Sequence, residues 1–359
     1  MLCDVSVMHS LHSFTTYVVY PLWYVVCLFF IRYTTYDILF PMDWKQQTTG
    51  LLASAEQPLI VVLGPTASGK TAFSIRLAHF IASTGRPAEI LNADSRQLYT
   101  YLDIGTAKIR TEDMQDVPHH LLNVLDPKED VSAGWYQKEA RSAIQSIHSK
   151  NSVPLLVGGS MLYVSSVVDG LTMAPVPEPA LRAQLIREYE QDAGKTLYAR
   201  LQQVDPETAE GIHPNNMPYV VRAMEVYEML EEPKSSAVPQ TELRSSAHAS
   251  SPYDLLIFGM QWERQELCRR INERTRRMFA EGWIEEVETL LKQGYRAEDP
   301  GLKSHGYREI IAYMEGAQDD PDTLQELIAA KTRQYARRQM TWWKGDARIR
   351  WLTQKDVQG

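Results

Sequence analysis

Short apolar runs alternate with helical patterns from residue 58 to about residue 171. The apolar runs have the length and composition of strands that are buried on both faces of a parallel sheet. They cover residues 59–63, 89–93 and 153–157. Two segments between them, 71–83 and 134–149, carry apolar residues at helical spacing. This alternation predicts an α/β fold, in which helices flank a doubly wound parallel sheet.

The alternation stops between residues 171 and 253. Helical patterns follow one another there and predict a helical insertion, at residues 178–192, 195–204 and 218–230. Residues 234–252 are rich in Ser, Pro and Ala and have too little apolar content to pack, so we expect a mobile loop. The apolar run 255–259 resembles a strand that returns to the sheet. The chain after residue 264 is mostly helical in pattern and locally basic.

The first 57 residues differ in character from the rest. Residues 14–31 form an almost uninterrupted apolar and aromatic run, which lies at the lower limit of length for a transmembrane helix. No convincing cleavage site follows the run. Two interpretations stay open, a signal anchor and a start codon placed too far upstream, with Met42 a plausible true start. We expect membrane contact only if residues 14–31 are translated.

Composition and charge limit the class of protein. The chain has 359 residues and is 44% hydrophobic, which is ordinary for a globular protein with a core. Its net charge of −8 argues against binding nucleic acid over the whole surface, but not against a local basic groove. The three cysteines do not support a disulfide framework or a four-ligand zinc site. We expect Cys268 to be a free thiol and the protein to be cytoplasmic and monomeric, with no stable protein partner.

A glycine-rich segment follows the first predicted strand and matches G-x-x-x-x-G-K-[ST]. Its glycines let backbone N–H groups turn inward around a polyphosphate, as in ATP-binding and other nucleotide-binding proteins, and the following helix adds its dipole. Lys70 supplies a positive charge, and the Thr71 hydroxyl can bind Mg²⁺, the cofactor that we expect. The predicted phosphate-binding loop consists of Gly64, Pro65, Thr66, Ala67, Ser68, Gly69, Lys70 and Thr71.

The loop alone does not identify the phosphate compound. An enzyme that hydrolyses NTP should carry an aspartate after an apolar strand to hold Mg²⁺. The predicted strand at 153–157 runs instead into Gly158, Gly159 and Ser160. The missing acid argues against an NTP-hydrolysing enzyme such as a motor ATPase.

Asp94 follows the second predicted strand, at the carboxyl end of the sheet, where open α/β folds bind ligands. A carboxylate there could take a proton from an incoming nucleophile, while Arg96 and Gln97 offer donors and acceptors to a planar base. The alternative is that Asp94 caps a following helix. The spacing alone leaves both open.

Several motifs occur in the order seen in tRNA dimethylallyltransferases, and the chain resembles that family from about residue 58 to residue 351. The motifs lie at residues 64–71, 94–99, 103–108, 118–121, 158–163, 212–215, 222–226, 306–309 and 332–339. The resemblance implies a P-loop core that is interrupted by a helical tRNA-binding domain. The expected parts are an N-terminal extension (1–57), the first part of the core (58–171), the insertion (172–258), and the completed core with a basic helical C-terminal part (259–359).

The resemblance also implies a reaction. N6 of the adenosine 3′ of the tRNA anticodon would attack C1 of dimethylallyl diphosphate, which gives N6-(dimethylallyl)adenosine and releases diphosphate. The P-loop would then hold the leaving group. Asp94 matches the family's proposed general base, Ser160 stands where the family usually has threonine, and Arg274 matches an arginine expected to help neutralise the diphosphate.

Basic residues are concentrated near the C-terminus. Residues 331–350 carry seven Lys or Arg against one Asp, with aromatic residues between them, and residues 264–277 carry six Arg against two Glu. This composition is typical of surfaces that bind RNA backbones and stack unpaired bases. The alternative is two solvated amphipathic helices whose tryptophans belong to the core. The predicted contacts with the tRNA anticodon stem-loop are Asp94, Ser95, Arg96, Gln97, Arg222, Arg333, Arg337 and Arg338.

The sequence departs from the family at a few positions. Asn216 stands where the family usually has aspartate and Tyr219 where it has arginine, so a tRNA contact could differ. Ser304 and His305 replace an apolar pair that is commoner in the family. The adjacent histidines at 119 and 120 point to opposite sides of an extended chain, which argues against zinc and leaves substrate contact or local structure open.

Three other functions each account for part of the sequence. An adenylate dimethylallyltransferase acting on free nucleotide would need neither the insertion nor the basic C-terminal part. A P-loop small-metabolite kinase is disfavoured by the missing acid after residue 157. A non-catalytic RNA-binding protein would not explain why a polyphosphate loop and a positioned acid occur together.

Overall fold

The computed structural model describes residues 43–169, 178–237, 251–317 and 320–358. The apolar run at 14–31 and residues 238–250 of the predicted mobile loop lie outside these ranges. Within them, the structure has no helix with the length and apolar character needed to cross a membrane. The predicted cytoplasmic location stays a prediction.

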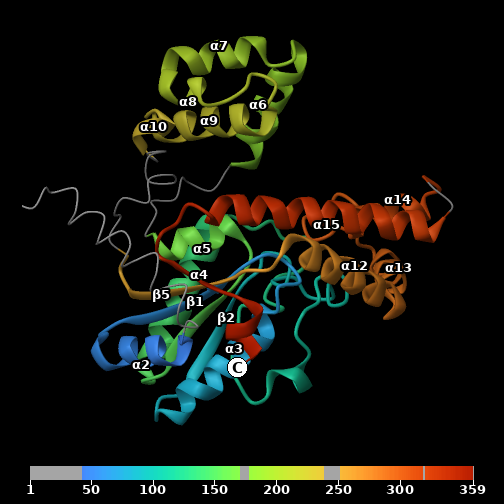
Figure 1. The fold of residues 1–359 in the computed structure, drawn as a ribbon. Helices are drawn as coiled ribbons and strands as arrows, with labels where there is room; N and C mark the ends of the chain where they lie inside the picture. The colour runs from blue at the N-terminus through green and yellow to red at the C-terminus, as the bar shows by residue number, and fades with distance from the viewer. Residues whose placement is uncertain (1–42, 170–177, 238–250, 318–319, 359) are drawn as a thin grey trace, which may run out of the picture. The chain divides into compact units, whose positions relative to one another are not determined.

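A parallel sheet of six strands lies at the centre of the described residues (Figure 1). The strands are β1 (Pro58–Leu63), β2 (Ala88–Ala93), β3 (His119–His120), β4 (Val153–Gly158), β5 (Asp254–Met260) and β6 (Ile349–Leu352). Their order across the sheet is β3-β2-β4-β1-β5-β6, and each neighbouring pair runs parallel. The predicted α/β fold with a parallel sheet is confirmed.

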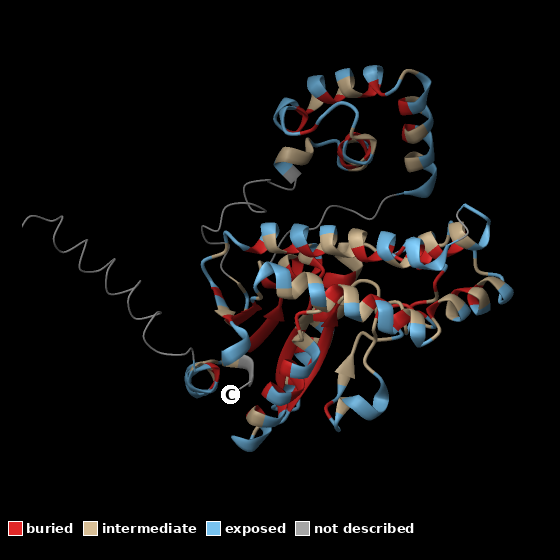
Figure 2. Ribbon diagram, turned by 45° about the vertical axis from the view of Figure 1, so that its right-hand side comes forward, coloured by how far each residue is buried: buried red, intermediate tan, exposed pale blue. Residues whose placement is uncertain are grey.

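Helices cover both faces of the sheet. From β1 the chain crosses to β2 through α3 (Lys70–Ser83) and comes back to β4 through α4 (Ala133–Ser149). Crossovers between parallel strands are right-handed in nearly all proteins, and these two run in opposite directions along the sheet, which puts the helices on opposite faces. The strands between them are buried along almost their whole length (Figure 2). This explains why their sequence reads as continuous apolar runs rather than as an alternation.

The N-terminal part of the described chain contains a helix that the sequence did not predict, α2 (Trp44–Ser54). Its Trp44 side chain is buried and packs edge-on against Phe73 and Phe80 of α3, with ring centroids 5.3 Å apart in each case. These contacts pack residues 44–54 of the predicted extension (1–57) against the α/β core. The sequence did not indicate this helix because its buried residues, Trp44 and Thr48, form no apolar pattern at helical spacing.

The insertion consists of α6 (Pro179–Gln191), α7 (Lys195–Val204), α8 (Pro206–Glu210), α9 (Met217–Leu230) and α10 (Lys234–Ala237). It has an apolar core of its own, which includes Leu185, Leu201 and Met224. Strand β5 pairs with β1 in the sheet, as expected for the apolar run 255–259, so the residues of β5 before the predicted boundary at 258 pack with the core.

The C-terminal part adds four longer helices, α12 (Arg264–Ala280), α13 (Trp283–Lys292), α14 (Tyr307–Met314) and α15 (Pro321–Trp343), and the short α16 (Gln354–Gln358). The sequence analysis had not identified β6, a short edge strand that pairs with β5. The α/β part of the chain also contains the helix α5 (Met161–Val168) and the exposed 3-10 helix η1 (Thr111–Met114). Helices α12 and α15 pack together, and α15 also contacts α5.

The strand register brings the predicted site residues to one edge of the sheet. Gly158 at the end of β4 is level with Ala93 of β2 and with Leu63 of β1. The P-loop, Asp94 and the turn after Gly158 therefore all leave the sheet at the same edge, as the carboxyl ends of parallel strands must.

Candidate active site

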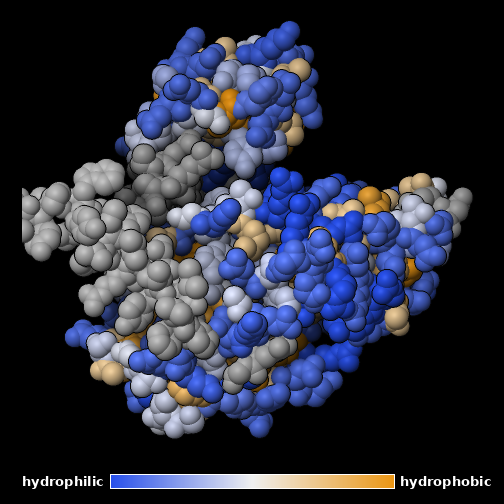
Figure 3. Space-filling model, viewed as in Figure 1, coloured by the Kyte–Doolittle hydropathy of each residue, from blue (hydrophilic) through white to orange (hydrophobic). Residues whose placement is uncertain are grey.

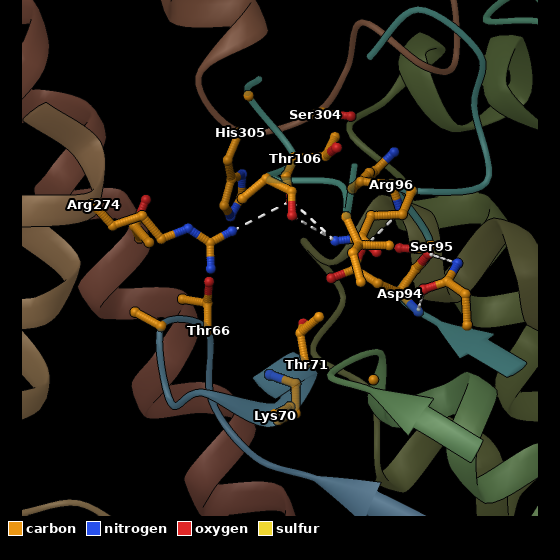
Figure 4. Close-up of a pocket in the computed structure, with 18 of the residues that line it drawn as sticks. Thr66, Lys70, Thr71, Asp94, Ser95, Arg96, Thr106, Arg274, Ser304 and His305 are labelled. Atoms are coloured by element: carbon orange, nitrogen blue, oxygen red, sulfur yellow. Dashed lines mark hydrogen bonds between the residues drawn. The ribbon is translucent and has the colours of Figure 1, made fainter. Parts of the chain in front are cut away.

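The P-loop joins β1 to α3, as the motif predicts. Its backbone is left-handed at Ala67 (φ 62°) and at Gly69 (φ 87°), the residue before the first turn of α3. This conformation turns successive N–H groups toward one side, where an anion can bind at the helix N-terminus. Thr66, Ala67, Lys70 and Thr71 line a pocket at this edge of the sheet (Figure 4).

Lys70 is partly buried beneath the P-loop and lines the pocket. Its Nζ donates to the carbonyl oxygens of Gly64 at 3.0 Å and Pro65 at 2.8 Å. Burial lowers the pKa of Lys70 to about 8, while the negative charge of Asp94 opposes this shift and the positive charge of Arg274 adds to it. Lys70 is therefore mostly charged at neutral pH and loses its charge under mildly alkaline conditions.

Asp94 lies where β2 ends and lines the same pocket (Figure 4). Its backbone N–H donates to the side chain of Asn92, and its Oδ1 accepts from the N–H of Arg96 at 3.0 Å. These contacts make a turn and no helix begins here, so the cap interpretation is wrong. No residue in the described ranges hydrogen-bonds to Oδ2 of Asp94, which leaves this oxygen available to a ligand.

Ser160 supports the pocket from behind. Its hydroxyl accepts from the N–H of Ser95 at 2.8 Å and also hydrogen-bonds to the hydroxyl of Tyr335. Ser95 and Tyr335 line the pocket, but Ser160 itself does not. The hydroxyl that the sequence assigned to catalysis thus lies behind two pocket residues, where it holds their positions.

Arg274 reaches the pocket from α12, as Figure 4 shows. Its Nη2 donates to the carbonyl oxygen of Thr106 at 3.3 Å, and the side-chain amide of Gln97 donates to the same oxygen at 3.1 Å. Burial lowers the pKa of Arg274 and the Asp94 charge opposes that shift, yet a guanidinium stays charged in proteins. Arg274 and Lys70 therefore give the pocket two fixed positive charges at neutral pH.

Two residues that the sequence analysis did not single out hold the outer side of the P-loop. The indole Nε1 of Trp262 donates to the carbonyl of Ser68 at 2.9 Å, and Nε of Arg270 donates to the carbonyl of Ala67 at 2.9 Å. The Arg270 guanidinium also lies over the Trp262 ring, 4.1 Å from its centroid. The concentration of arginines in 264–277 was the available signal, but Arg274 was the one member of this segment assigned to the phosphate end of the pocket.

Gln339 of α15 connects the P-loop to the turn after β4. Its amide nitrogen donates to the Gly159 carbonyl at 2.7 Å, and its amide oxygen accepts from the Thr66 N–H at 3.1 Å. A Cβ on Gly159 would lie 2.4 Å from the Gln339 nitrogen, so only glycine allows this approach. The basic C-terminal helix thereby contacts the P-loop as well as presenting an exposed surface.

One part of the pocket wall is apolar. Its hydrophobic side chains come from β2, β4, the segment after β3 and the C-terminal helices. They are Ile90, Leu122, Val157, Ile271, Met278, Trp283 and Ile328. A hydrocarbon group attached to a phosphate could lie against them while the P-loop holds the phosphate.

His119, His120 and His305 differ in their position relative to the pocket. His119 and His305 line the pocket, and the His305 ring packs edge-on against Tyr335 with centroids 5.5 Å apart. His120 instead pairs with Glu89 at 2.7 Å, outside the pocket lining. Substrate contact therefore remains open for His119 and His305, whereas His120 has a local structural partner.

The predicted tRNA contacts separate into paired and unpaired arginines. Arg222 bonds to the fully buried Glu225 within the insertion, and Arg333 bonds to Asn272 and to Glu326. Arg337 and Arg338 are exposed, and neither forms an ion pair within the residues that the structure describes.

The two C-terminal tryptophans differ in burial. Trp342 is 44% exposed, whereas Trp343 is 3% exposed and packs in the core. Figure 3 shows hydrophilic side chains gathered over α12 and α15. Trp343 therefore fits the interpretation of a core tryptophan, while RNA binding by the basic helices stays a prediction.

The oxygen-bearing residues of the pocket fit Mg²⁺ only in combination with a ligand. In the described parts of the chain, no cluster of three or more His, Cys, Asp or Glu could hold a metal ion. Thr71 and Asp94 each bring oxygen to the pocket, and Mg²⁺ commonly binds through one or two protein oxygens together with substrate phosphates and water.

Comparison with known proteins places the chain in a family. The family model described as IPP transferase matches residues 97–346. The chain belongs to the IPP transferase family. It is 41% identical over 303 residues to a tRNA dimethylallyltransferase of Geobacter sulfurreducens, and the match covers 84% of this chain and 94% of the relative. A second member, from Symbiobacterium thermophilum, is 40% identical over 296 residues, which cover 82% of this chain and 89% of the relative.

Solved structures agree with this placement. The tRNA isopentenylpyrophosphate transferase of Bacillus halodurans is 32% identical, with a TM-score of 0.60 over 84% of this chain and 94% of that one. A eukaryotic dimethylallyltransferase, described in crystals as acting on tRNA, has a TM-score of 0.70 over 83% of this chain and 74% of that one. At 24% identity the eukaryotic enzyme supports the shared fold alone.

Proposed function

We propose that this member of the IPP transferase family transfers a dimethylallyl group from dimethylallyl diphosphate to N6 of the adenosine 3′ of the anticodon in tRNA. The observation that carries the proposal is that Lys70, Thr71, Arg274 and Asp94 all line one pocket. A cradle for a diphosphate and a carboxylate for a proton therefore face the same space.

The leaving group would bind at the P-loop. As the bond between C1 and the diphosphate oxygen breaks, its electron pair moves to the diphosphate and negative charge grows there. Lys70, Arg274 and the inward-turned N–H groups lie where they can stabilise this charge, in a largely buried environment that strengthens the attraction. The apolar wall would hold the hydrocarbon and keep water from the allylic carbon.

Mg²⁺ would contribute at the same end of the pocket. The Thr71 hydroxyl would hold it together with diphosphate oxygens and water. When bound, the ion supplies positive charge that offsets the charge of the leaving group.

The acceptor would enter from the side of Asp94. The N6 nitrogen forms the new bond to C1, and the proton that it loses passes to the carboxylate of Asp94. Oδ1 is held by the Arg96 N–H at 3.0 Å, so Oδ2 is the oxygen that would take this proton. An adenine in a folded tRNA must first leave its stack to reach this point, at a cost of a few kcal/mol.

Several observations favour tRNA over the alternatives. The bacterial relatives are named for tRNA, and both the insertion and the exposed Arg337, Arg338 and Trp342 would be superfluous for a free nucleotide. The kinase interpretation gains no support, because β4 ends at Gly158 without an acid and the family is one of transferases of a prenyl group.

The substitution Asp94→Asn tests the proposal. The amide oxygen keeps the turn contact to Arg96, but the side chain can no longer take a proton. We expect kcat for transfer of labelled dimethylallyl groups to tRNA to fall by about 10²–10⁴-fold, with tRNA binding retained. The matched control is Asp113→Asn, in the exposed η1 helix away from the pocket. Wild-type activity in Asp94→Asn would refute the assignment of the base.

A further inference from the structure

The segment 103–107 forms one wall of the pocket although it has no regular secondary structure. Gly105, Thr106 and Ala107 line the cavity, and the Thr106 carbonyl accepts hydrogen bonds from both Arg274 and Gln97. The position of this loop therefore sets where the Arg274 guanidinium lies.

Glu286 of α13 holds the loop through backbone contacts. Its Oε2 accepts from the N–H groups of Asp103 at 2.9 Å and Ile104 at 2.7 Å, and its Oε1 accepts from the N–H of Gly105 at 3.2 Å. The Tyr307 hydroxyl donates to Oε1 as well, at 2.7 Å. Hydrogen bonds to an ionised acceptor are about twice as strong as those between neutral groups. One carboxylate thus fixes three consecutive residues of the loop.

The buried indole ring of Trp283 packs against the same loop. A Cβ on Gly105 would lie 2.0 Å from Nε1 of Trp283, and a Cβ on Gly306 would lie 2.0 Å from another atom of that ring. Trp283 is 2% exposed, so it cannot move aside into solvent. The indole limits how far the loop can approach, while Glu286 prevents the loop from moving away.

We infer that Glu286 is a positioning residue for prenyl transfer, which acts on the diphosphate by holding the Thr106 carbonyl, and through it Arg274, in place. The inference rests on the proposed function. Glu286 is not among the residues that line the pocket, so it does not touch the substrate. We expect its effect on the rate to pass mainly through Arg274, and to a smaller extent through Gln97.

The substitution Glu286→Gln removes the charge and half of the acceptor capacity with little change in size. The control is Glu285→Gln, because Glu285 is also in the first turn of α13 but is exposed and makes none of these contacts. We expect Glu286→Gln to lower kcat about tenfold or more and to leave KM for tRNA within about twofold. Glu285→Gln should leave both unchanged.

A double-mutant cycle with Arg274→Ala separates positioning from general damage. If Glu286 acts through Arg274, adding Glu286→Gln to Arg274→Ala should lower kcat by no more than about twofold further. If the two effects multiply in full, or if Glu286→Gln behaves like Glu285→Gln, the inference is wrong. Should Glu286→Gln fail to fold, Tyr307→Phe removes one donor and leaves the three backbone contacts, and the same cycle applies to it.

Failure of the inference can be told from failure of the proposed function. A wild-type protein that transfers nothing to tRNA refutes the proposed function. An active wild type with an impaired Arg274→Ala variant, but with a fully active Glu286→Gln variant, refutes only the role of Glu286.

Discussion

Lys70 should make the enzyme sensitive to mildly alkaline pH. The residue lies in the P-loop with its ammonium group against the Gly64 and Pro65 carbonyls. Burial lowers its pKa to about 8, from 10.5 for an unperturbed lysine. The group is a cation below its pKa, so the positive charge that we propose binds diphosphate is present at neutral pH and disappears as the pH rises through about 8.

The size of the effect follows from the pKa. With a pKa of about 8 the charged fraction is about 0.9 at pH 7 and about 0.1 at pH 9, a drop of about tenfold. With the ordinary value of 10.5, nearly all of the lysine would still be charged at pH 9. The two cases therefore differ by about an order of magnitude in the active fraction of the free enzyme.

The pH dependence of kcat/KM for dimethylallyl diphosphate measures this fraction, because kcat/KM reports ionisations of the free enzyme. We expect kcat/KM to fall about tenfold between pH 7 and pH 9. The fall in kcat should occur at higher pH, since bound diphosphate stabilises the charged lysine. Lys70→Arg keeps a charge at all these pH values, so its kcat/KM should be lower but flat. A flat wild-type profile, or an unchanged fall in Lys70→Arg, would refute the reasoning.

Two further predictions concern α15. Gln339→Leu leaves the Thr66 N–H and the Gly159 carbonyl without their hydrogen-bond partner. The free-energy cost is about 1–3 kcal/mol for each of these groups that no water molecule reaches. The KM of Gln339→Leu for dimethylallyl diphosphate should rise at least tenfold. The control Gln334→Leu changes an exposed residue of the same helix and should match wild type. Equal KM values for Gln339→Leu and wild type would contradict the bridging role. Arg338→Ala should reduce the slope of log K for tRNA against log salt by about 1. The control Arg269→Ala should leave the slope unchanged, because Glu266 and Glu273 already neutralise Arg269. Equal slopes in wild type, Arg338→Ala and Arg269→Ala would exclude a contact between Arg338 and a tRNA phosphate.

Much of the core could be predicted because local patterns determine it. Strands buried on both faces must be apolar throughout, and the P-loop glycines have a backbone role that few other sequences satisfy. Because β1, β2 and β4 are parallel, the positions of Lys70 and Asp94 at one edge follow from the strand order.

The rest depends on contacts between distant parts of the chain. Gln339 reaches Thr66 across 273 positions, and Glu286 reaches Asp103 across 183. Gln339 lies in the motif 332–339, but no local pattern shows which distant residue either side chain contacts. The Ser160 hydroxyl was assigned to catalysis from the family motif, but its position behind Ser95 depends on how β2 and β4 align. The same holds for Trp342 and Trp343, since only the packing of α15 determines which side of the helix meets the core.

The most direct test of the central claim is to incubate the protein with dimethylallyl diphosphate, Mg²⁺ and an unmodified tRNA that has adenosine 3′ of the anticodon, and then to identify the product by mass spectrometry of the digested RNA. The account predicts one added dimethylallyl group on that adenosine, at N6, and none on free AMP offered in the same reaction. Modified AMP with unmodified tRNA, or consumption of ATP without any prenylated product, would contradict it.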